Sequence, residues 1–107
     1  MDQAKVREVL ALYRKKFEEF NIPHDEYSNE YPKWIIPDGG RTEEIMFGTP
    51  HFHFLAHCES MLDQMEVFIQ EDKMDEVFRW LGFIQGVLWQ CGIYTVGEMA
   101  NHNRPPK

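Results

Sequence analysis

Between residues 51 and 91 the apolar side chains recur every three or four positions, and one short polar break interrupts them. Before the break the apolar residues are Phe54, Leu55, Cys58, Met61, Leu62, Met65, Phe68 and Ile69. After it they are Met74, Val77, Phe78, Leu81, Ile84, Leu88 and Cys91. This period is that of an amphipathic helix. The pattern therefore predicts two helices, 51–70 and 73–92, and a break as short as 71–73 makes them antiparallel neighbours.

The second helix differs from the first because it is apolar on most sides. Trp80, Phe83 and Val87 form a flank of their own beside the main stripe, which predicts a central position in the bundle. Gly82 and Gly86 lie four residues apart on one face, and each costs about 1 kcal/mol of helix stability relative to Ala. We expect the close approach of another backbone or of a bound group to compensate for this cost.

The ends of the chain carry helix signals as well. Apolar residues at 6, 9, 10, 13, 17 and 20 predict a helix over 1–20. Asp2 should cap its start, and Asn21 followed by Pro23 should end it. Asp72 should cap the helix at 73–92, which Gly92 should end. Thr95 and Glu98 form a capping-box pattern that predicts a short helix over 95–103.

Residues 21–50 interrupt the helical pattern with four prolines and three glycines. The turn signal at 38–40 favours an irregular excursion or a hairpin. Its aromatic and aliphatic content is too high for a linker, so we expect it to pack on the helices. The predicted fold class is all-α: a small bundle of three main helices and a short C-terminal helix, with an aromatic-rich insertion between the first two, in a single domain of 107 residues.

Composition narrows the function classes. A net charge of −7 argues against direct DNA binding, which requires lysine and arginine on the phosphates. The two cysteines form no CxxC pair, which excludes a zinc knuckle or a disulfide scaffold. No signal peptide and no apolar run of membrane-spanning length is visible. We therefore expect a cytoplasmic protein that does not enter a membrane and keeps its thiols reduced.

The C-terminal half carries a resemblance. The stretch FRWLGFIQGVLW at 78–89, GIYT at 92–95 and HNRP at 102–105 is similar to a family of small uncharacterised proteins encoded by tailed bacteriophages and prophages. The likeness covers about two-thirds of the chain, and residues 27–50 look like an insertion. It transfers no catalytic residues. It implies a phage accessory protein that acts in the cytoplasm of a bacterial host, where such proteins commonly redirect or block a host process.

A histidine group near residue 51 is the first candidate site. His53 and His57 are four residues apart, so both could reach one metal ion from one helix face, with His51 and Cys58 close by. A metalloprotease would need Glu directly after the first His, and that position is Phe54. A zinc site also needs a third and a fourth ligand. We therefore favour structural roles for these residues and expect neither a metal nor another cofactor.

An acidic cluster is the second candidate. Residues 51–78 contain seven acids against one lysine, Lys73. The acids are Glu59, Asp63, Glu66, Glu71, Asp72, Asp75 and Glu76. They could form a solvated helix face, or a surface that binds a basic partner. A third interpretation is a magnesium site of an all-α nucleotide hydrolase, although the paired ExxE and ExxD pattern is missing.

The helix at 73–92 and the C-terminus contain a third set of polar residues. A nucleotide pocket could form beside Gly82 and Gly86, with Arg79, Gln85 or Arg104 as polar contacts. The other interpretation is core packing with one hydrogen-bonded Gln85, together with a C-terminal clamp at 102–105. No nucleophile elbow surrounds Ser28 or Ser60, and no phosphate-binding glycine loop is present.

The function that we predict is a non-enzymatic accessory protein of phage origin that binds a host macromolecule, with a host protein as the expected partner. The predicted contact residues are Glu59, Asp63, Glu66, Asp72, Asp75 and Glu76, joined by Tyr27, Tyr31 and Trp34 of the excursion. Self-association fits the high aromatic content as well. The alternative is a small-ligand module, either a nucleotide-sequestering protein or a metal-dependent nucleotide hydrolase.

Overall fold

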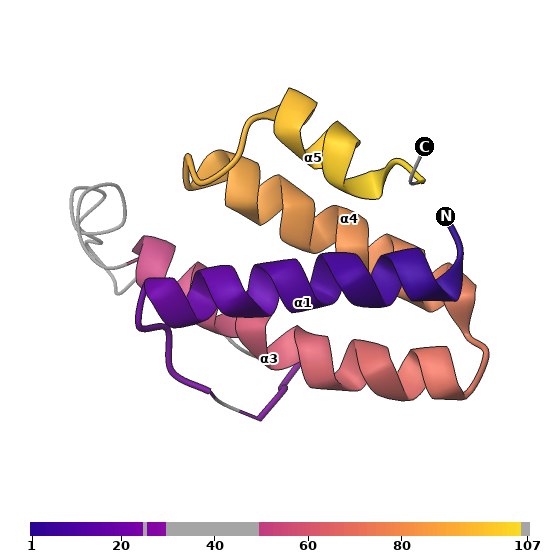
Figure 1. The fold of residues 1–107 in the computed structure, drawn as a ribbon. Coiled ribbons are helices and arrows are strands. Elements are labelled where there is room, and N and C mark those ends of the chain that lie inside the picture. Colours follow the sequence, from indigo (N-terminus) through magenta and orange to yellow (C-terminus); the bar gives the residue numbers. More distant parts are fainter. Residues whose placement is uncertain (25, 30–49, 106–107) are drawn as a thin grey trace.

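The computed structural model describes residues 1–24, 26–29 and 50–105, and within these ranges the regular structure is entirely helical. The helices are α1 (Gln3–Glu19), α3 (Pro50–Gln70), α4 (Met74–Gln90) and α5 (Val96–Asn103) (Figure 1). The all-α prediction is confirmed, and each helix lies within two residues of its predicted bounds. The hairpin considered around 38–40 lies outside the described residues.

Side chains and turns fix the ends of α1 as the sequence predicts. The Asp2 carboxylate accepts a hydrogen bond from the backbone N–H of Lys5 at 2.8 Å. At the other end Asn21 adopts a left-handed conformation with φ of 55°. The N–H of Ile22 then reaches the carbonyl of Phe17 at 2.9 Å, which closes the helix.

The later predicted caps at Gly92 and Thr95 are also present. Gly92 has a φ of 73°, and beyond it the N–H of Ile93 bonds the carbonyl of Leu88 at 2.9 Å. Thr95 and Glu98 exchange side-chain and backbone hydrogen bonds at 3.0 Å in both directions, which is the predicted capping box. Two closely spaced signals thus turn the chain from α4 into α5.

Asp72 was expected to cap α4, and that prediction is wrong. Asp72 is instead the left-handed residue that ends α3, with φ of 59°. The N–H of Lys73 bonds the carbonyl of Phe68 at 2.8 Å, as in the turn after α1. Lys73 occupies the N-cap of α4 without a side-chain hydrogen bond. An aspartate tolerates the left-handed region better than most residues do, so it serves the turn rather than the cap.

The central helix is α3, not α4 as the sequence suggested. α3 packs against α4 on one side and α1 on the other, while α5 lies against α1. α4 buries one stripe, Val77, Leu81, Ile84 and Leu88. The main core joins this stripe to Val6, Val9, Leu10, Tyr13 and Phe17 of α1 and to Leu55, Cys58, Met61, Leu62, Met65 and Ile69 of α3. The extra aromatic flank misled the prediction, because aromatics also occupy exposed positions on α4.

A polar network fastens α5 to the rest of the bundle. The buried Tyr13 hydroxyl accepts an N–H of the Gln85 amide at 2.9 Å and lies 3.0 Å from His102 Nδ1. Gln85 and Asn103 pair reciprocally through their amides, at 2.8 and 3.2 Å. The Tyr94 ring packs against the rings of Tyr13 and His102. Met99 is the one buried residue of α5, so these contacts contribute much of what fixes α5 on the bundle.

Candidate functional site

The predicted acidic face is not one exposed surface, because Glu59 is buried. Glu59 is only 5% exposed. Its carboxylate lies 2.8 Å from His24 Nδ1 and 3.7 Å from the Arg14 guanidinium. The hydrogen bond to Glu59 raises the pKa of His24 above its usual 6.5. Glu59 therefore joins α3 to α1 and to the segment after α1, and it cannot present its charge to a partner.

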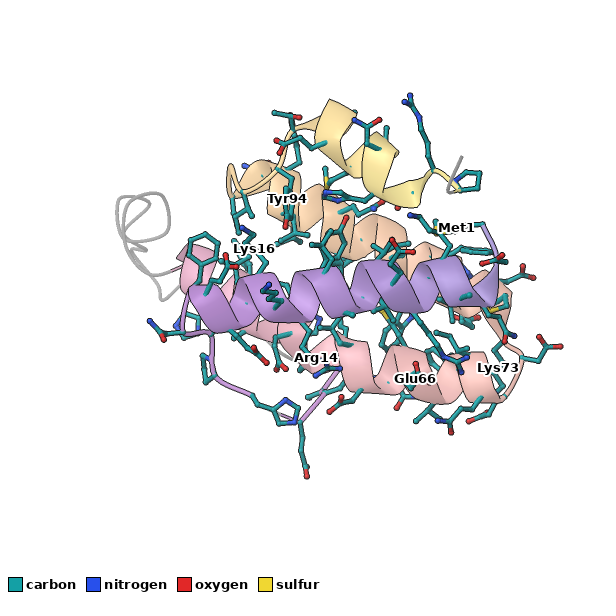
Figure 2. The ribbon with its side chains drawn as sticks, in the orientation of Figure 1. Met1, Arg14, Lys16, Glu66, Lys73 and Tyr94 are labelled. Carbon is teal, nitrogen blue, oxygen red and sulfur yellow. The ribbon has the colours of Figure 1, made fainter. Side chains whose placement is uncertain are left out.

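The next two acids along α3 pair with α1. Arg14 donates to Asp63 at 2.9 Å, and Arg7 donates to Glu66 at 3.0 Å. Figure 2 shows Arg14 on α1 and Glu66 on the neighbouring stretch of α3. These two ion pairs were not predicted from the sequence, although the spacing of the charged residues indicates them. Arg7 and Arg14 are seven residues apart and so share one helix face, as do Asp63 and Glu66.

The turn between α3 and α4 keeps two carboxylates without a cation. Lys73 pairs with Glu71 at 2.8 Å, and Arg79 pairs with Glu76. Within the described part of the chain no ion pair reaches Asp72 or Asp75. Asp72 accepts only a long hydrogen bond of 3.4 Å from the amide of Gln3. Asp72 and Asp75 are therefore the members of the predicted acidic face whose exposed negative charge no described cation neutralises.

A surface hollow of about 540 Å³ adjoins this turn. Apolar groups of Phe68 and Met74 line it together with the charged groups of Asp72, Lys73, Asp75, Glu76 and Arg79. Its chemistry combines an apolar contact area with excess negative charge. Such a site suits a side chain that carries a cation on an aliphatic stem, because the stem can pack while the charge meets the carboxylates.

Of the three aromatic residues predicted as anchors, Tyr27 lies within the described residues. Tyr27 packs on Trp80 at 4.8 Å and on His57 at 5.7 Å between ring centroids, so it covers the helices at the α3–α4 side. Phe68 also packs against Trp80 in an edge-on arrangement, with 4.9 Å between the ring centroids. Tyr31 and Trp34 lie outside the described residues. Tyr27 therefore acts first as a packing residue.

α4 turns a second apolar surface to solvent. Phe78, Phe83 and Trp89 are 40%, 53% and 55% exposed. Gly82 and Gly86 are exposed as well, and a Cβ added at either would meet no described atom within 4 Å. No described part of the chain makes the close approach that we expected at these glycines. Within the described residues, nothing compensates for the helix stability that the two glycines cost.

The residues of the alternative nucleotide pocket do not converge. The Gln85 amide donates hydrogen bonds to Tyr13 and Asn103. Gly82 and Gly86, in contrast, are exposed to solvent. Arg104 donates to the Asn101 side chain at 2.8 Å. Arg79 lines the hollow at the turn between α3 and α4. The C-terminal residues form a clamp, as the other interpretation held, and His102, Asn103 and Arg104 make it through side-chain contacts.

The side chains of His57, Cys58 and Cys91 are buried or partly buried, whereas that of His51 lies outside the described part of the chain. No group of three His, Cys, Asp or Glu side chains among the described residues could hold a metal ion, and this includes His53 and His57. Burial lowers the pKa of His57, whose ring also contacts Phe83. Burial raises the pKa of the Cys58 thiol to about 12 and also raises that of Cys91. Neither cysteine is therefore an activated nucleophile at neutral pH.

Comparison of the chain with protein-family models, with curated proteins and with solved structures found no match. None of the helices in the described ranges is both long and apolar enough to cross a membrane.

Proposed function

We propose that this chain is a non-enzymatic binding protein that docks on a host macromolecule, most simply a host protein, in the bacterial cytoplasm. The phage setting rests on the sequence resemblance at 78–105. The site that we assign to the partner is the acidic turn, defined as Asp72, Asp75 and the adjoining hollow. The partner would present lysine or arginine side chains to it.

One observation carries this proposal: the pairing pattern of the acids. Glu59, Asp63 and Glu66 are engaged by α1 or His24, which leaves Asp72 and Asp75 as the members of the predicted face with unneutralised charge. Unpaired exposed carboxylates cost no rearrangement when a basic group arrives, and they speed encounter through long-range attraction. Phe68 and Met74 beside them add apolar contact area.

The test is an affinity capture from bacterial lysate that compares two matched double variants. Asp72→Asn with Asp75→Asn removes the unpaired charges, and asparagine keeps the left-handed turn at 72 accessible. Glu18→Gln with Glu26→Gln is the control, because it makes the same change in net charge at exposed residues away from the turn. Both variants should keep the wild-type melting temperature.

We expect one host protein to bind the wild type and the control and to be lost from the Asn variant and at raised salt. Equal capture by both variants would contradict the assigned site. A co-purified nucleotide without a protein would contradict the proposed function itself and favour the small-ligand alternative.

A further inference from the structure

The outward face of α4 has the spacing of a helix that pairs with another helix. Arg79, Gly82, Gly86 and Trp89 follow one another at steps of three, four and three residues. This is the seam spacing of paired helices, in which every seam position meets the partner. The buried stripe of α4 is a different set of residues, so the seam points away from this chain's own core.

The surroundings of the two glycines favour a helix as the occupant. Both glycines are exposed, and a Cβ at either would enter open space among the described atoms. Without side chains they form a flat strip on which a second backbone can lie close. Phe78 and Phe83 stand at the two sides of this strip, 40% and 53% exposed, and each would bury its ring against the arriving helix.

We propose that the occupant is a second copy of this chain, joined through antiparallel α4 helices. With the two-fold axis at the level of Ile84, Gly82 of one copy lies opposite Gly86 of the other. The same register brings Arg79 opposite Trp89, which allows a cation–π contact on each side of the axis. The Arg79 side chain is 70% exposed and Trp89 is 55% exposed, so a second copy can reach both. Arg79 would exchange its ion pair with Glu76 for the contact with Trp89, and such a surface pair is weak.

Charge selects the antiparallel arrangement over the parallel one. In a parallel pair each seam residue meets its own copy, so the two Arg79 side chains would repel each other. The antiparallel pair separates them and also opposes the two helix dipoles. No acidic residue lies between Arg79 and Gln90, so the contact itself buries no carboxylate. The repulsion between two copies of net charge −7 is screened by salt. The dimer seam shares Arg79 with the hollow at the acidic turn, whereas Gly82, Gly86 and Trp89 lie outside that hollow. The proposed dimer does not rest on the proposed function.

The first experiment is sedimentation velocity of the full chain over a dilution series from hundreds of micromolar to low micromolar. We expect a reversible dimer in the wild type. Gly82→Leu with Gly86→Leu should weaken it by about tenfold or more, equivalent to about 1.4 kcal/mol. These residues have room for side chains within the monomer, so the variant should keep its helical content. Ala4→Leu with Ala100→Leu is the matched control at exposed helical positions off α4, and it should dimerise normally.

The second experiment tests the register by disulfide cross-linking in a Cys91→Ser background. Gly82→Cys mixed with Gly86→Cys should give a cross-linked heterodimer, whereas each variant alone should cross-link poorly. A chain that stays monomeric at every concentration would overturn the proposal. So would a dimer that the two leucines leave intact, or cross-linking of each cysteine variant only with itself.

Discussion

Replacing Tyr13 with phenylalanine tests how α5 is held. The substitution keeps the buried ring and removes only the hydroxyl, which contacts Gln85 at 2.9 Å and His102 at 3.0 Å. Each neutral hydrogen bond contributes about 1 kcal/mol net, and a donor left unsatisfied adds to the cost. Gln85 and His102 are partly exposed, so water can replace some of what is lost. We therefore expect Tyr13→Phe to lower the free energy of unfolding by about 1.5 kcal/mol.

The assay is urea and thermal unfolding followed by circular dichroism. A loss of this size should lower the melting temperature by about 6 °C for a domain of this length. Tyr94→Phe is the matched control: it deletes the same group from a ring packed in the same cluster, but its hydroxyl makes no hydrogen bond within the described residues. The control should change the free energy of unfolding by less than about 0.5 kcal/mol.

A double-mutant cycle with Gln85→Leu then isolates the Tyr13–Gln85 contact. The effects of the two substitutions on the free energy of unfolding should be non-additive by about 1 kcal/mol, because either substitution alone already removes the shared hydrogen bond. Additive effects, or a Tyr13→Phe variant as stable as the Tyr94→Phe control, would refute the view that this network fastens α5 to α1 and α4.

Three further predictions concern ionisation, packing and capping. The His24 ring should titrate in NMR spectra with a midpoint above 6.5, because Glu59 favours its charged form, and Glu59→Gln should bring the midpoint back toward 6.5. The fold stabilises protonated His24, so this contribution is complete below about pH 6.5 and is lost as the pH rises through the higher folded pKa. Leu62→Ala should cost about 3–5 kcal/mol in urea unfolding, since Leu62 is fully buried in the central helix. Thr95→Ala should cost about 1 kcal/mol and speed amide hydrogen exchange in α5, because it removes half of the capping box.

The sequence by itself determined the helices and most of their ends. Apolar spacing of three and four residues is a local property of each segment, and so are the caps at Asp2 and Thr95. Such signals act within one or two helical turns, so they do not depend on contacts between the helices. The three-residue break after α3 likewise decided that α3 and α4 lie antiparallel.

The tertiary structure alone decided which faces are covered. Trp80 and Phe83 look alike in the sequence, yet Tyr27 packs on the first while the second is 53% exposed. Glu59 and Asp75 both read as surface acids, yet only Glu59 became buried beside Arg14 and His24. Burial and charge pairing depend on which helices meet, and contacts between residues far apart in the chain set that outcome. The candidate site could therefore be placed on an acidic segment from sequence, whereas its reduction to Asp72 and Asp75 required the packed bundle.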